Sequence, residues 1–143
     1  MFNRSPRFSR RPSDKDQVAS ARKMPEQPKD LVKRTFAFAQ AVRRFVDGLS
    51  KSVSNYEDAK QLVRSSGSVA ANYLEAQEGL SRKDFFYRIK VCRKEARESG
   101  LWLSLLSVVA DSALAIERLR LVAEAEELKR IFSSIAGKDD TGD

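Results

Sequence analysis

Residues 81–106, SRKDFFYRIKVCRKEARESGLWLSLL, carry the strongest helical pattern in the chain and decide its fold class. Each residue of an α-helix advances about 100° around the axis. With Phe85 as the reference direction, four further apolar or small side chains fall within about 40° of it: Ile89, Cys92, Ala96 and Leu103. The stretch therefore predicts an amphipathic helix with one buried edge.

The charged residues of this stretch divide between two flanks. Six cations fall between about 60° and 180° from Phe85 and form what we call the basic flank: Arg82, Lys83, Lys90, Arg93, Lys94 and Arg97. The opposite flank holds three acids and an aromatic residue, with one arginine among them: Asp84, Glu95, Glu98, Trp102 and Arg88. Because six neighbouring cations repel each other, the basic flank has three interpretations. It is neutralised by solvent and salt, it meets acidic residues of a neighbouring subunit, or it binds a nucleic-acid backbone.

The rest of the chain predicts three more helices and no strand of any length. Apolar residues recur at steps of three and four, and polar caps and glycines bound the segments. The expected helices are residues 30–48, 55–78, 81–109 and 112–136. Their expected N-caps are polar residues: Asp30, Ser54 or Asn55, Ser81, and Asp111 or Ser112. Four long helices with short connections indicate an all-α, up-down-up-down four-helix bundle over residues 29–137.

The two ends of the chain differ from this domain in composition. Residues 1–28 contain all four prolines and almost no periodic hydrophobicity, so we expect a disordered Arg/Ser/Pro-rich arm. Of the net charge of +7, residues 1–29 contribute +5, from 8 Lys/Arg and 3 acids. Such an arm either binds the phosphate backbone of a nucleic acid or is simply solvated. Residues 138–143 form an acidic tail.

One segment of the second expected helix has an unusual composition. In residues 64–79, RSSGSVAANYLEAQEG, small and polar side chains fall where a buried face is expected: Ser65, Ser66, Gly67, Ser68 and Asn72. Small residues let two helix backbones approach closely, and buried polar groups then need hydrogen-bond partners. A tight helix–helix contact is favoured over a ligand or recognition site. Glu75 and Glu95 are interpreted as inward-facing partners of Arg64 or Arg88 that specify the bundle.

The inventory of reactive groups argues against catalysis. The chain has no histidine, and its one cysteine, Cys92, falls on the apolar edge of residues 81–106. No phosphate-binding glycine loop, metal-ligand spacing or apolar run of about 20 residues appears. We therefore expect a non-enzyme with no metal or cofactor, no membrane association and a cytoplasmic location.

Three stretches together are similar to a known family. They are AKQLVRSSGSVAANYLEA (59–76), KDFFYRIKVCRKEARESGLWLSLL (83–106) and EAEELKRIF (124–132). The chain resembles, over about residues 30–136, the bacterial four-helix-bundle proteins first described as encoded in intervening sequences of 23S ribosomal RNA genes. The resemblance implies a homopentamer. It also implies kinship with the accessory protein of diversity-generating retroelements, a basic pentamer that binds nucleic acid and a reverse transcriptase.

The same resemblance gives four polar residues a structural role. Ser65, Asn72, Glu75 and Glu95 match motif positions in adjacent helices, which implies a buried polar network that fixes helix register. The chain departs from the family pattern at Ser99, where threonine is common, and in the additional basic arm.

Together these features predict a non-catalytic, homo-oligomeric bundle that binds nucleic acid, with RNA favoured over DNA. The six cations of the basic flank are the expected contacts, assisted by the arm, and a reverse transcriptase or another protein is a further candidate partner. The alternative is an oligomeric protein-interaction scaffold whose basic flank forms the subunit interface.

Overall fold

The computed structural model describes residues 30–140. The expected arm of residues 1–28 and the last three residues of the acidic tail lie outside this part of the chain.

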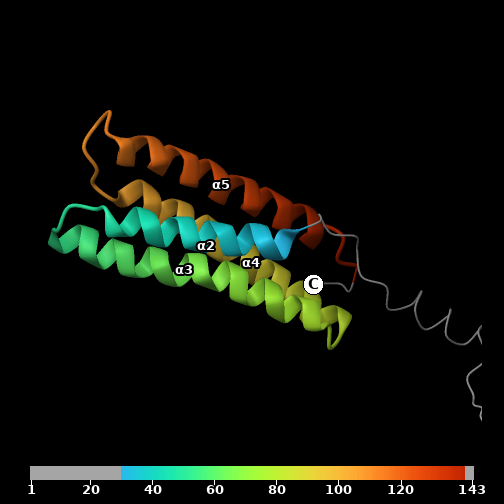
Figure 1. The fold of residues 1–143 in the computed structure, drawn as a ribbon. Helices are drawn as coiled ribbons and strands as arrows, with labels where there is room; N and C mark the ends of the chain where they lie inside the picture. Colours follow the sequence, from blue (N-terminus) through green and yellow to red (C-terminus); the bar gives the residue numbers. More distant parts are fainter. Residues whose placement is uncertain (1–29, 141–143) are drawn as a thin grey trace, which may run out of the picture.

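Residues 30–140 form four α-helices that lie side by side, and no strand occurs among them (Figure 1). The helices are α2 (Leu31–Asp47), α3 (Val53–Glu78), α4 (Arg82–Leu105) and α5 (Ala113–Ala136). The connections 48–52 and 106–112 lie at one end of the bundle, and the 79–81 turn lies at the other (Figure 1). The all-α prediction with four helices is thus confirmed.

Serine caps begin three of the helices. The hydroxyls of Ser52, Ser81 and Ser112 accept a hydrogen bond from the backbone N–H three residues on, at 3.0–3.1 Å. The caps expected at Ser81 and Ser112 are found. The cap of α3 is Ser52, earlier than expected, and Asp30 has a left-handed backbone (φ 62°) without a side-chain cap bond.

Helix α4 ends at Leu105, four residues before the expected end of the 81–109 segment. Leu106 adopts an extended backbone (φ −65°, ψ 143°) and its side chain is buried. Burial of this leucine offsets the loss of further helical hydrogen bonds, so the chain leaves the helix while the apolar pattern continues.

The core contains side chains from all four helices, and α4 packs against both α3 and α5. Phe85 and Phe86 contact each other edge to face, with ring centroids 5.2 Å apart, and Tyr73 of α3 lies 5.9 Å from Phe132 of α5. Both arrangements are favoured by aromatic quadrupoles. The buried edge predicted for residues 81–106 is present, and its members are Phe85, Ile89, Cys92, Ala96 and Leu103.

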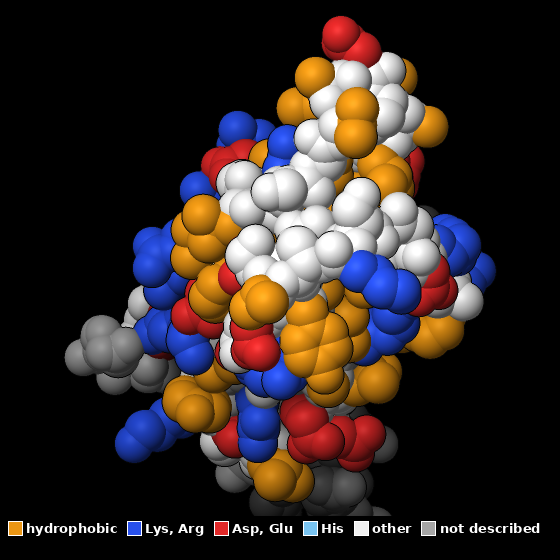
Figure 2. Space-filling view, turned by 90° about the vertical axis from the view of Figure 1, so that its left-hand side faces the viewer, with side chains coloured by type: hydrophobic (Ala, Val, Ile, Leu, Met, Phe, Trp, Pro, Cys, Tyr) orange, Lys and Arg blue, Asp and Glu red, His pale blue; other side chains and the backbone are white. Residues whose placement is uncertain are grey.

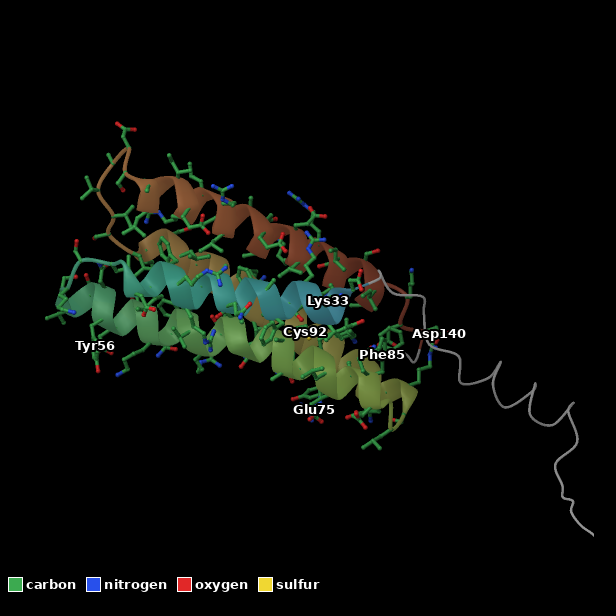
Figure 3. All side chains as sticks on the ribbon, in the orientation of Figure 1. Lys33, Tyr56, Glu75, Phe85, Cys92 and Asp140 are labelled. Atoms are coloured by element: carbon green, nitrogen blue, oxygen red, sulfur yellow. The ribbon has the colours of Figure 1, made fainter. Side chains whose placement is uncertain are left out.

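Hydrophobic side chains remain exposed at the end of the bundle that carries the 48–52 and 106–112 connections (Figure 2). They include Val53, Tyr56 and Val109. In Figure 3, Tyr56 lies near this end of α3.

Asn55 joins the two connections at this end. Its amide nitrogen donates to the carbonyls of Ser50 and Ser107, each at 3.1 Å, and its amide oxygen accepts from the N–H of Ser107 at 2.9 Å. Because Asn55 is buried, these bonds replace the water that would otherwise solvate three backbone groups. The sequence suggested a helix cap at this position; its structural role is to hold the loops together.

Replacing Asn55 with alanine should lower the free energy of unfolding by about 1–3 kcal/mol, because buried backbone groups lose their partners. Asn55→Asp should also destabilise, since a carboxylate accepts from Ser107 but faces two carbonyl oxygens without a donor. Urea unfolding followed by circular dichroism measures both changes. The exposed neighbour Ser54→Ala is the control and should change stability by less than about 0.5 kcal/mol. Equal effects of N55A and S54A would contradict this role.

Candidate nucleic-acid interface

Helix α4 is the most positively charged helix of the described bundle. It carries seven Lys/Arg and three Asp/Glu, which gives a net charge of +4. The corresponding values are +3 for α2, −2 for α3 and 0 for α5. A basic helix on the surface is therefore the strongest candidate for contact with an anionic partner.

The acidic side of α4 faces α3. Glu95 is buried and its carboxylate accepts from Arg64 of α3 at 3.1 Å. Arg88 donates to the amide oxygen of Asn72 at 3.0 Å. The interpretation that Glu95 pairs with Arg64 is therefore correct, and Arg88 pairs with the asparagine. These contacts place one side of α4 against α3, and the basic flank lies on the side of α4 that faces away from α3.

The six cations of the basic flank divide into two groups. Arg82, Lys90 and Lys94 form ion pairs: Arg82 with Asp140, Lys90 with Asp139, and Lys94 with Glu95. The other three form no ion pair with any carboxylate of residues 30–140, and we call them the open cations: Lys83, Arg93 and Arg97. Among the open cations, Lys83 and Arg97 are exposed and Arg93 is half-buried. Three of the six cations predicted to contact nucleic acid are therefore already paired within the chain.

Two of these pairs, those of Arg82 and Lys90, arise because the chain after α5 returns across the start of α4. Gly137 closes α5 with a backbone bond to Ser133, and the chain then runs past Arg82 and Lys90. In Figure 3, Asp140 accordingly lies at the same end of the bundle as Phe85 of α4. The charge pattern of residues 81–106 gives no indication of this approach, since the carboxylates lie about fifty residues further along the chain.

The expected polar network is present in part, as two separate clusters. Ser65 and Ser99 share a buried hydrogen bond of 2.8 Å, and Ser99 also donates to the carbonyl of Glu95 at 2.9 Å. Asn72 belongs to the second cluster, with Arg88. Because serine is small, this contact supports the interpretation of the polar segment as a close approach of α3 and α4.

Glu75 does not belong to either cluster. It is exposed and points away from the bundle (Figure 3), contrary to its expected place in the network. The reason is its angle: Glu75 follows the buried Tyr73 by two residues, about 200° around the helix.

Cys92 lies inside the bundle and is chemically protected (Figure 3). Its thiol donates to the carbonyl of Val69 at 3.5 Å, and burial raises its pKa to about 12. Burial likewise raises the pKa of Tyr73 to about 12. Such a thiol is a poor nucleophile because the thiolate is the reactive form. Within residues 30–140, no three or more His, Cys, Asp or Glu side chains are placed to hold a metal ion.

A shallow groove continues the basic flank toward α5. It has a volume of about 340 Å³ and is lined by side chains of both helices, among them Arg97, Leu101 and Glu126. Gly100 forms part of its floor, where a β-carbon would stand 3.9 Å from that of Ala125. The groove gives an extended ligand a concave surface beside an open cation.

The fold and the charged helix define a small all-helical protein with a basic surface. The sequence model of the 23S rRNA-intervening sequence protein family matches residues 28–134, and the chain belongs to this family. A comparison with curated proteins finds no match. No helix among residues 30–140 is long and apolar enough to cross a bilayer.

A similar solved structure supports the same fold. It is the 1.70 Å crystal structure of a protein of unknown function from the S23 ribosomal protein family of Bacteroides thetaiotaomicron VPI-5482. The similarity has a TM-score of 0.65 and 24% sequence identity, and it covers 75% of this chain and 95% of that chain.

The buried thiol predicts a defined pH dependence. The unfolded thiol has a pKa near 9 and the folded one near 12, so between these values the unfolded chain loses a proton that the folded chain keeps. The free energy of unfolding should therefore fall as pH rises, by up to about 1.4 kcal/mol per pH unit. Cys92→Ala removes this term, so the stability advantage of the parent over the variant should shrink between pH 8.5 and 10.5 in urea titrations. A constant difference across this range would contradict the burial of the thiol.

Proposed function

We propose that the protein is a non-catalytic, homo-oligomeric bundle that binds nucleic acid, RNA in particular, through the basic flank of α4. The observation that carries the proposal is the net charge of +4 on this helix together with its three open cations, Lys83, Arg93 and Arg97. Their side chains lie on the side of α4 that the contact with α3 leaves uncovered.

The chemistry of these groups suits a phosphate backbone. Lysine and arginine displace condensed counterions from nucleic acid, which makes binding favourable and strongly salt-dependent. Such contacts fix position and carry little base information. We therefore expect affinity for RNA with weak sequence preference.

Neutralising the open cations should remove this affinity. Lys83→Gln, Arg93→Gln and Arg97→Gln together should weaken binding of a single-stranded oligoribonucleotide at least about tenfold at 0.1 M salt. The slope of log K against log salt should become shallower by about 2, because three phosphate contacts are lost. Fluorescence anisotropy of a labelled oligoribonucleotide across a salt series measures both quantities.

The control carries the same change in net charge on another part of the surface. Lys33→Gln, Arg44→Gln and Lys51→Gln lie on α2 and the following connection, and all three side chains are exposed. The control should keep most of its affinity. Equal losses in the two triple variants would mean that net charge alone controls binding, and parental affinity that does not change up to 0.5 M salt would contradict backbone binding altogether.

A protein-interaction scaffold is the second candidate function, favoured by exposed leucines near the basic flank. Leu101 and Leu105 keep 51% and 53% of their surface exposed, and Leu101 lines the same groove as Arg97. Apolar area of this kind is typical of the centre of a subunit contact. In this alternative, up-down-up-down bundles assemble through this face, and a homopentamer is the expected assembly.

Charge reversal separates the two functions. Lys94→Glu with Arg97→Glu should leave the oligomer intact and abolish RNA retention if the flank binds nucleic acid. Loss of the oligomer, measured by size-exclusion chromatography with light scattering, would instead favour the scaffold.

A further inference from the structure

The segment that follows α5 occupies part of the basic flank. The Lys90 ammonium lies 3.0 Å from a carboxylate oxygen of Asp139, and the Arg82 guanidinium lies 3.1 Å from a carboxylate oxygen of Asp140. Arg82 also donates to the carbonyl of Lys138 at 3.3 Å. Two of the six cations therefore already hold anionic oxygens of the same chain.

The two ion pairs differ in their exposure to water. The side chains of Asp139 and Lys90 keep only 7% and 28% of their surface exposed, whereas Asp140 keeps 81%. A partly desolvated pair is screened less by salt than an exposed one. Asp139 is therefore the anchor of the segment and Asp140 a weaker second contact.

Arg82 is also oriented by the core. Its guanidinium lies 5.0 Å from the centre of the Phe86 ring, and the ring itself is buried. This cation–π contact orients the guanidinium independently of the carboxylate that it binds. Arg82 and Lys90 contact adjacent residues of one segment, and together they form a site for anionic oxygens on the N-terminal half of α4.

We infer that Arg82 and Lys90 form a phosphate-binding site on the basic flank, and that the chain's own Asp139 and Asp140 fill it as an internal competitor of the nucleic-acid backbone. The inference rests on the proposed function and adds a regulation of the same surface. Carboxylate and phosphate oxygens accept the same charge-assisted hydrogen bonds, so either group satisfies the two cations.

The competition favours long polyanions over small ones. A tethered carboxylate acts at a high effective concentration, so it excludes a single free phosphate. A nucleic-acid strand also engages Lys83, Arg93 and Arg97, and the counterions released there offset the cost of displacing two carboxylates. The segment thus lowers the affinity of the basic flank for nucleic acid but leaves the open cations accessible.

The test replaces both carboxylates by amides of the same size. In the full chain, Asp139→Asn with Asp140→Asn should bind a labelled single-stranded oligoribonucleotide about three- to tenfold more tightly at 0.1 M salt. The slope of log K against log salt should steepen by about 1.4, because two more cations reach phosphates. A second variant that ends at Gly137 should show the same gain, and thermal melting checks that both variants are folded.

The matched control changes net charge by the same amount at the other end of the bundle. Asp47 ends α2 and Asp111 lies in the 106–112 connection, and both are exposed. Asp111 has φ 60°, a conformation that asparagine also adopts. Asp47→Asn with Asp111→Asn should leave the affinity within about twofold of the parent. Adding Arg82→Gln and Lys90→Gln to the Asp139/Asp140 variant should cancel its gain.

The outcomes separate the inference from the proposed function. A gain in the Asp139/Asp140 variant that the control lacks and the Arg82/Lys90 changes cancel supports the inference. Equal gains in variant and control, or RNA binding by the parent with no gain in the variant, overturn it and leave the proposed function standing. Absence of RNA binding in the parent and in every variant overturns both.

Discussion

The close contact between α3 and α4 is the constraint on which the rest of the structure depends. At this contact, a buried hydrogen bond between the hydroxyls of Ser65 and Ser99 links the two helices. Small side chains at this position let the helices approach, and the Arg64–Glu95 pair fixes their rotation. Once α4 is held with this side toward α3, its buried edge faces the core and its basic flank must face away from α3. The surface chemistry of the protein thus follows from an interior contact.

Electrostatics then divides the basic flank into occupied and open parts. Near its N-terminal end, Arg82 and Lys90 meet carboxylates of the segment after α5, and burial of Asp139 shields that interaction from salt. Lys83, Arg93 and Arg97 have no carboxylate partner among residues 30–140, and Lys94, between the last two, pairs with Glu95 of the same helix. Like charges on one helix repel each other, so a bound anion stabilises the open part as well. The flank is therefore not one uniform surface.

Much of the fold could be predicted because helices are encoded by short periods. The edge marked by Phe85 and Ile89 is buried as its spacing predicts, and the caps at Ser81 and Ser112 have the expected geometry. The candidate site was less predictable. The angle of each cation on α4 follows from the period, but whether it is paired depends on carboxylates far away in the sequence. Glu75 shows the same difficulty. Motif similarity assigned this residue to a buried network, but its side chain lies on the exposed side of α3.

The sequence by itself determined the class of fold, the approximate positions of the four helices and which edge of α4 is buried. These properties arise from side-chain periodicity and local hydrogen bonds, which involve residues within a few positions of each other. Only the tertiary structure decided that Asn55 joins two loops and that Asp139 covers Lys90. Such contacts depend on where separate helices end and how they pack. The distance between those groups is set by the whole bundle, and no local pattern records it.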